Sequence, residues 1–271
     1  MEVSVLNCGT MRPRGARFLV PQMSASPCLC LLIEDADRLI LVDTGLGTED
    51  VEDPTGRLGF SNVLLNAQRD PALTALRQVR KRGLRMERVT DIICTHLDRD
   101  HAGGLPDFPD ARVHVLRPER DHALDPPSRR ERERYRRCHF THGPRWEVHE
   151  GTSGEDWFGF NCIRNIEGLP SEVVLVPLPG HTLGHCGVAV RYGQGWLFHC
   201  GDAYYARAEL ADGKRPPPGV RVFRSVAHLD RTCALRQLDR IKMLLAAHGS
   251  EVATIASHDQ AEYVKRFGRE P

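Results

Sequence analysis

THLDRDHAGG, residues 95–104, follows a short apolar strand and contains an unusual density of potential metal ligands. It places His96, Asp98, Asp100 and His101 within six residues. Imidazole and carboxylate are typical ligands of divalent metals such as zinc. On an extended stretch His96, Asp98 and Asp100 would point to one side, and a turn at Asp100–His101 would direct the later groups toward a second ion. A solvated polar loop is the alternative, and it explains this density poorly.

Three later segments add potential ligands where apolar strands end. PGHTLGH (179–185) contains His181, HCGD (199–202) ends in Asp202, and ASHDQ (256–260) contains His258. Each residue alone is more typical of a turn or a cap. All of them, however, are expected at carboxyl ends of strands, where functional groups gather over a rigid scaffold. The four segments together therefore predict one shared metal site.

The rest of the chain predicts one domain, 1–271, with an arginine-rich insert at about 125–145. A length of 271 residues is near the upper limit for a single core, ~250–300 residues. Hydrophobic residues make up 41% and charged residues 27%, as in ordinary globular proteins. Strands and helices alternate in blocks, which favours an α/β fold of sheets covered by helices.

Charge and hydropathy argue against several classes of partner. The formal net charge of +1 gives no overall attraction to nucleic acid or anionic membranes. The N-terminal segment has no apolar core typical of a secretory signal, and no run approaches the ~20 apolar residues of a membrane span. We therefore expect a cytoplasmic protein without nucleic-acid or membrane partners. Its nine cysteines, none in a C-x-x-C pair, are interpreted as buried small apolar residues, Cys28 included.

The motifs THLDRDHAGG, PGHTLGH, GD and SHD, in this order, resemble the motif series of the metallo-β-lactamase superfamily. LVDTG, which contains Asp43, resembles the opening motif of that series. The resemblance covers about residues 3–267. It implies a four-layer αββα sandwich with two divalent metals in a groove at one edge.

The resemblance also implies roles for individual residues. His96, Asp98 and His181 would hold one metal, Asp100, His101 and His258 the other, and Asp202 would bridge both together with a water or hydroxide. Asp43 and His185 would support the ligands without binding metal.

Asp98 departs from the family pattern, which usually has histidine there. Three carboxylates and one hydroxide would balance two divalent ions completely, so the pKa of the bound water would be lowered less. The additional oxygen ligand favours harder ions, iron(II) or manganese. We nevertheless predict zinc, because it is the commonest metal in such sites.

The predicted activity is hydrolysis of a small-molecule lactone or related ester. Two metals ~3.5–4 Å apart generate a bridging hydroxide near neutral pH and polarise the oxygen under attack. The family's quorum-signal lactonases look similar, with a tyrosine at the offset of Tyr205 that contacts the substrate carbonyl; Tyr204 is the alternative donor. Asp100 or Asp202 would pass a proton to the leaving alkoxide.

Three other functions stay open at this stage. A thioester hydrolase of the glyoxalase II type usually has histidine at position 98. A phosphodiesterase usually needs a basic surface and an added exosite domain, for which this length leaves little room. A metal-binding module without catalysis would have lost a ligand, and none is missing from the motifs.

Six arginines between 129 and 137 dominate the insert and alternate with two glutamates. Pairs at i,i+3 and i,i+4 neutralise part of this charge, which favours a solvated helix face. The alternative is a lid over the metal groove, with an arginine that meets a substrate carboxylate. The pocket walls would then include Tyr135, Phe140 and Trp146, together with Trp157 and Phe158. A second candidate wall is formed by Arg221, Phe223 and Arg224.

Overall fold

The computed structural model describes residues 1–151, 154–211, 218–268 and 271. Its larger sheet has six strands among these residues, in the order β1-β2-β3-β4-β5-β6. Neighbours from β1 to β3 are antiparallel, and neighbours from β3 to β6 are parallel. The strands are β1 (Glu2–Met11), β2 (Ser26–Asp35), β3 (Arg38–Val42), β4 (Val89–Ile93), β5 (Arg112–Leu116) and β6 (Arg145–His149).

The second sheet has four strands among the described residues, in the order β12-β11-β10-β9. Strand β11 pairs with β12 in parallel and with β10 antiparallel. The strands of this second sheet are β9 (Val173–Pro177), β10 (Cys186–Tyr192), β11 (Gly195–His199) and β12 (Val252–Ile255). A small hairpin, β7 (Glu155–Trp157) and β8 (Phe160–Cys162), packs beside them.

Helices flank the two sheets and fill the connections between strands. The longest is α10 (Arg231–His248). The other helices are α1 (Ala16–Leu19), α2 (Thr48–Glu52), α3 (Pro54–Leu58), α4 (Asn62–Leu65), α5 (Ala75–Lys81), α6 (Arg99–Ala102), α7 (Arg117–Leu124), α8 (Arg129–Arg134), α9 (Pro218–Ala227) and α11 (Gln260–Phe267). Single 3-10 turns are η1 (Pro21–Met23), η2 (Pro71–Leu73), η3 (Met86–Arg88), η4 (Leu105–Asp107), η5 (Arg137–His139) and η6 (Arg207–Leu210).

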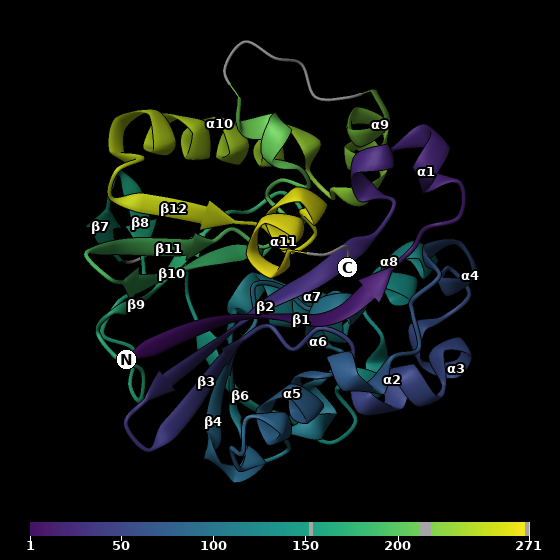
Figure 1. Ribbon diagram of the computed structural model, residues 1–271, viewed down its shortest axis with the longest axis horizontal. Coiled ribbons are helices and arrows are strands. Elements are labelled where there is room, and N and C mark those ends of the chain that lie inside the picture. Colours follow the sequence, from purple (N-terminus) through teal and green to yellow (C-terminus); the bar gives the residue numbers. More distant parts are fainter. Residues whose placement is uncertain (152–153, 212–217, 269–270) are drawn as a thin grey trace.

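The two sheets lie face to face, with helices on both outer faces (Figure 1). Side chains alternate along β2, so Leu29 and Leu31 face β10 of the second sheet while Leu32 faces the α5 layer. On the other outer face, Leu238 and Ile241 of α10 pack on β9 and β11. This order of layers confirms the predicted αββα sandwich.

Sequence patterns located the long elements better than the short ones. Pro71 and Gly83 are typical of the start and end of one helix, but the segment between them is divided at Thr74, which is extended and caps α5 with its hydroxyl. Helices α2 to α4 and α9 were missed because four or five residues show too little periodicity, and α9 follows a proline run. Residues 214–217 of that run lie outside the described residues. None of the described helices is long and apolar enough to cross a membrane.

Candidate metal centre

The predicted ligands come from both sheets and meet at one edge of the sandwich. The segment after β4 carries His96 and Asp98, and Asp100 and His101 lie on α6. The earlier expectation of a loop at Asp100–His101 was wrong, because one helical turn begins at Arg99. The second sheet supplies the remaining three from segments after β9, β11 and β12: His181, Asp202 and His258.

One half of the cluster surrounds His258. Its Nε2 lies 3.3 Å from Asp100 Oδ2 and 3.4 Å from Asp202 Oδ1. The Nε2 of His101 lies 3.4 Å from the same Asp202 oxygen and 3.3 Å from the His258 Nε2. His101, Asp202 and His258 are buried, and Asp100 is partly exposed with 14% of its side chain accessible. Most of these imidazole nitrogens and carboxylate oxygens therefore converge away from bulk water.

The other half surrounds Asp98. Its Oδ2 lies 3.3 Å from His96 Nε2 and 3.1 Å from His181 Nε2. Asp202 connects the halves, because its Oδ2 is 3.5 Å from His181 Nε2 while its Oδ1 faces His101 and His258. Two groups of potential ligand atoms are compact here: His96 with Asp98 and His181, and His96 with His101 and Asp202. The second group therefore contains residues from both of the ligand sets that the family pattern implies.

Backbone and side-chain contacts orient these ligands. Asp43 adopts a left-handed conformation with φ 57°, and its carboxylate accepts hydrogen bonds from the Thr95 backbone N–H and from His101 Nδ1. Such a strained residue persists only when surrounding contacts hold it. His185 donates from Nδ1 to a carbonyl oxygen and accepts the Asp202 backbone N–H at Nε2. Both contacts match the supporting roles expected for Asp43 and His185.

The cluster carries a strong negative field. Burial alone would lower the pKa of His258, but the carboxylates of Asp202 and Asp100 outweigh burial and raise this pKa to about 10. Burial would raise the pKa of Asp100, yet the hydrogen bond from His258 and the charge of His101 lower it. A site that favours positive charge so strongly is suited to bind cations.

Unpartnered polar atoms provide a direct test of whether metal ions fit. Among the described residues, His96 Nε2 and Asp202 Oδ1 are buried without a hydrogen bond of acceptable geometry. Buried polar atoms normally have a hydrogen-bond partner. Two atoms without one in the same cluster therefore indicate that a partner is missing. Imidazole and carboxylate donors around them match the chemistry of zinc, iron or manganese.

Arg134 of α8 enters the same cluster. Its guanidinium makes a two-pronged ion pair with Asp98, with Nη2 2.7 Å from Asp98 Oδ2, and also donates to His181 Nε2 over 2.6 Å. Burial and the charge of Arg134 lower the pKa of His181, so this imidazole is neutral and accepts the bond. A metal that uses the same nitrogen requires the guanidinium to release His181. The solvated face predicted for the insert is therefore wrong for Arg134.

Tyr205, and not Tyr204, faces the cluster. The Tyr205 hydroxyl lies 3.0 Å from His181 Nδ1, and the ring stacks beside His228. Tyr204 instead belongs to the apolar layer between the second sheet and α10.

A cavity of about 310 Å³ opens over the cluster. Its walls are largely apolar, with Arg134 and Tyr205 among the polar groups. The aromatic side chains that were expected to form the first pocket wall do not line this cavity. Tyr135 and Phe140 pack in the core of the larger sheet, and Trp157 packs in the core of the second sheet. Of the second candidate wall, Phe223 lines the cavity, whereas Arg221 and Arg224 do not. The other apolar lining residues include Met11, Met23, Leu64, Leu65, Val226 and Leu229.

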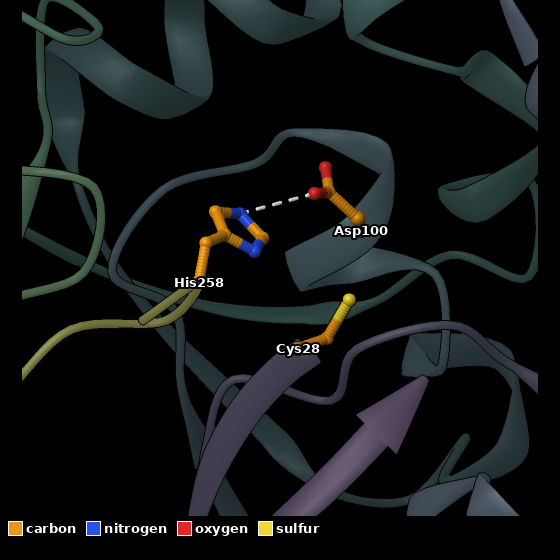
Figure 2. Close-up of side chains that lie close together, drawn as sticks. All are labelled: Cys28, Asp100 and His258. Atoms are coloured by element: carbon orange, nitrogen blue, oxygen red, sulfur yellow. Dashed lines mark ion pairs between the residues drawn. The ribbon is translucent and has the colours of Figure 1, made fainter. Parts of the chain in front are cut away.

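Two further buried residues, Glu119 and Cys28, lie at the site without having been predicted there. The Glu119 carboxylate of α7 accepts the Leu97 N–H over 2.9 Å and the Gly184 N–H over 3.2 Å, so it joins two ligand-bearing loops. The Cys28 thiol on β2 lies beside Asp100 and His258 (Figure 2). An acidic residue in a helix and a cysteine in an apolar strand are both too common to reveal such positions by pattern.

Comparisons with known proteins identify the family of the chain. The sequence pattern of the Metallo-beta-lactamase superfamily matches residues 23–248, so the chain belongs to that superfamily. Probable metallo-hydrolases of Mycobacterium tuberculosis and Mycobacterium bovis are each 40% identical over 263 residues, 97% of this chain and 82% of theirs. The chain is accordingly a metal-dependent hydrolase of the superfamily.

Solved structures share the fold. An N-acyl homoserine lactone hydrolase with N-hexanoyl-L-homoserine at its catalytic metal centre gives a TM-score of 0.71 at 22% identity, covering 99% of this chain and 98% of that one. The dizinc quorum-quenching lactonase AidC gives 0.62 at 17% identity, covering 94% and 86%. At these identities the likeness establishes the architecture alone.

Proposed function

We propose that this chain is a dinuclear metal hydrolase acting on lactones or related esters of small molecules, with zinc as its metal. The observation that carries the proposal is the convergence of four histidines and three aspartates at one buried edge, with Asp202 between the two halves. One metal would be held by His96, Asp98 and His181, the other by Asp100, His101 and His258, and Asp202 would bridge them.

Two such ions supply a hydroxide near neutral pH and polarise the carbonyl oxygen. The chain's own residues supply positioning and proton transfer. Tyr205 and Arg134 are two of the hydrogen-bond donors that line the cavity, and either can bind the substrate's carbonyl or carboxylate oxygen. Asp100 has the more exposed carboxylate, 14% against 6% for Asp202, and therefore suits proton transfer to the leaving alkoxide better.

The cavity favours an ester with an apolar chain. Its apolar side chains match an acyl group, whereas Arg134 matches an oxygen-bearing head group. The structural neighbours that bind N-acyl homoserine products support this substrate class.

The first test combines metal analysis with a substrate panel. Protein purified without added metal is analysed for zinc, iron and manganese, and the same batch is assayed on lactones, aryl esters, thioesters and phosphodiesters. We expect about two metal equivalents and lactone turnover. Removal of a residue that only contacts a metal ligand typically lowers metal affinity by ~10–100-fold. Asp202→Ala removes a proposed ligand, so it should lower metal affinity by at least this factor and activity with it. Asp239→Asn on the exposed face of α10 is the matched control and should retain both.

Each outcome decides a separate part of the proposal. Fewer than one tightly bound equivalent after resupply would contradict the metal centre. Two equivalents without lactone turnover would leave the centre in place and contradict the substrate class. Turnover of thioesters or phosphodiesters in that case would identify the alternative.

A further inference from the structure

The Cys28 side chain lies where the second metal of the proposed centre would bind. One ligand atom each from Cys28, Asp100 and His258 lie within 4.8 Å of one another, and Cys28 is 1% exposed. The thiol projects from the end of β2 toward the Asp100–His258 pair (Figure 2). This arrangement brings a sulfur donor to a site for which the family pattern implies only nitrogen and oxygen ligands.

The strand that carries Cys28 also orients the neighbouring histidine. His258 donates from Nδ1 to the carbonyl oxygen of Pro27 over 2.7 Å. A histidine fixed in this way presents the lone pair of Nε2 to a metal. The Pro27–Cys28 segment therefore orients one donor and adds another, and the buried Asp202 Oδ1 beside His258 has no hydrogen-bond partner among the described residues.

Distances are compatible with one ion among these donors. Zinc binds sulfur at ~2.3 Å and nitrogen or oxygen at ~2.0–2.1 Å, so donors to one zinc stand ~3–4 Å apart. Donor atoms that stand up to 4.8 Å apart would need to approach by about 1–2 Å. Rotation of the Cys28 or Asp100 side chain can supply part of that change.

Without a bound ion, burial and then the charge of Asp100 raise the pKa of the Cys28 thiol, so the thiolate would form only when a metal binds. The thiol proton leaves to solvent on binding, because a coordinated thiol is deprotonated.

We propose that Cys28 is an additional ligand of the second metal, beside Asp100, His101 and His258, and that its sulfur makes this site prefer zinc or cobalt(II) over manganese. The inference rests on the proposed metal centre but not on its substrate. It also distinguishes the two sites chemically: the site at Asp98 gains an oxygen donor, and the site at Cys28 gains a soft sulfur donor.

Cobalt(II) substitution tests this ligand without an activity assay. The wild-type protein loaded with cobalt should bind two equivalents and show a near-ultraviolet sulfur-to-cobalt charge-transfer band. Cys28→Ala should lose the band and weaken zinc binding at one site by at least ~10–100-fold. Cys30→Ala is the matched control: it removes another 1% exposed cysteine of β2 and should keep both. Cys28→Val replaces Cys28→Ala if the smaller side chain impairs folding.

The outcomes distinguish failure of the cysteine from failure of the metal centre. Two bound cobalt ions without the charge-transfer band, or a band that persists in Cys28→Ala, would overturn the Cys28 proposal alone. No bound cobalt in the wild type would overturn both proposals. Equal loss of the band in Cys28→Ala and Cys30→Ala would assign it to general disruption of β2 and also contradict the proposal.

Discussion

Arg134 and Asp98 form an ion pair, and the role of each residue depends on the other. Asp98 stands where the family usually has histidine, and the structure places a guanidinium against its carboxylate. Burial would raise the pKa of Asp98, but Arg134 and then His96 outweigh burial and lower it strongly. Asp98 is therefore ionised, and Arg134 competes with a metal for both Asp98 and His181.

Replacing Arg134 should separate these effects. Arg134→Met leaves a buried carboxylate without its partner, which typically costs about 3–5 kcal/mol, so the metal-free protein should unfold at lower temperature. The same change removes a competing cation, so zinc should bind the site at Asp98 more tightly and stabilise the variant more than the wild type. Thermal unfolding with and without zinc, together with chelator competition, measures both effects.

Arg132→Met, an exposed position on the same helix, is the control and should change neither quantity. A zinc-induced stabilisation of Arg134→Met equal to or smaller than that of the wild type would show that Arg134 does not compete with metal.

At the scale of elements, α7 positions two ligand loops that are distant in the sequence. Glu119 lies in the first turn of α7, where the helix dipole favours an acidic side chain. Its carboxylate reaches the loop of His96 and the loop of His181 at once. Gly184 is required for this approach, because a Cβ there would lie 2.2 Å from the Glu119 backbone nitrogen.

Glu119→Gln should weaken this connection. The amide retains one oxygen acceptor but turns an NH₂ toward a backbone N–H, leaving a buried donor unsatisfied. We expect the free energy of unfolding to fall by about 1–3 kcal/mol and metal affinity to fall with it. Denaturant unfolding of the metal-free protein measures the first effect, and chelator competition measures the second.

The exposed Glu87→Gln is the matched control and should behave as the wild type. A loss of stability with unchanged metal affinity would restrict Glu119 to a structural role.

At the scale of the whole molecule, the proposed metal centre would connect the two sheets. His96, Asp98, Asp100 and His101 follow a strand of the larger sheet, whereas the other three proposed ligands follow strands of the second sheet. Ions held by both sets would crosslink the sandwich at one edge. Metal binding is then coupled to the stability of the entire fold.

Removal of metal should therefore lower the melting temperature. Free metal at 100 times the dissociation constant of one site stabilises the folded protein by about 2.7 kcal/mol. This free energy corresponds to a rise in melting temperature of about 5–10 °C for a chain of this size. Differential scanning calorimetry before and after chelation, and again after zinc is restored, measures the change. Magnesium in place of zinc is the control, and an unchanged melting temperature would contradict a metal that bridges the sheets.

The sequence alone determined the alternation of strands and helices and the candidate ligands, whereas the order of layers followed from the resemblance to the metallo-β-lactamase superfamily. The first two features depend on local signals, such as apolar runs, turn residues and polar groups at strand ends. All seven predicted ligands meet at one edge because strand ends gather there.

Only the tertiary structure decided what surrounds those ligands. Arg134 and its neighbours have the same charge pattern, yet Arg134 alone reaches Asp98 because α8 packs against α9, where the Ala227 carbonyl accepts its Nη1–H. Cys28 resembles any cysteine of a buried strand until the end of β2 is placed beside α6 and the segment after β12. Contacts between residues far apart in the sequence, 36 residues for Arg134 and Asp98 and 93 for Arg134 and Ala227, leave no local pattern, so they become visible only when the chain has folded.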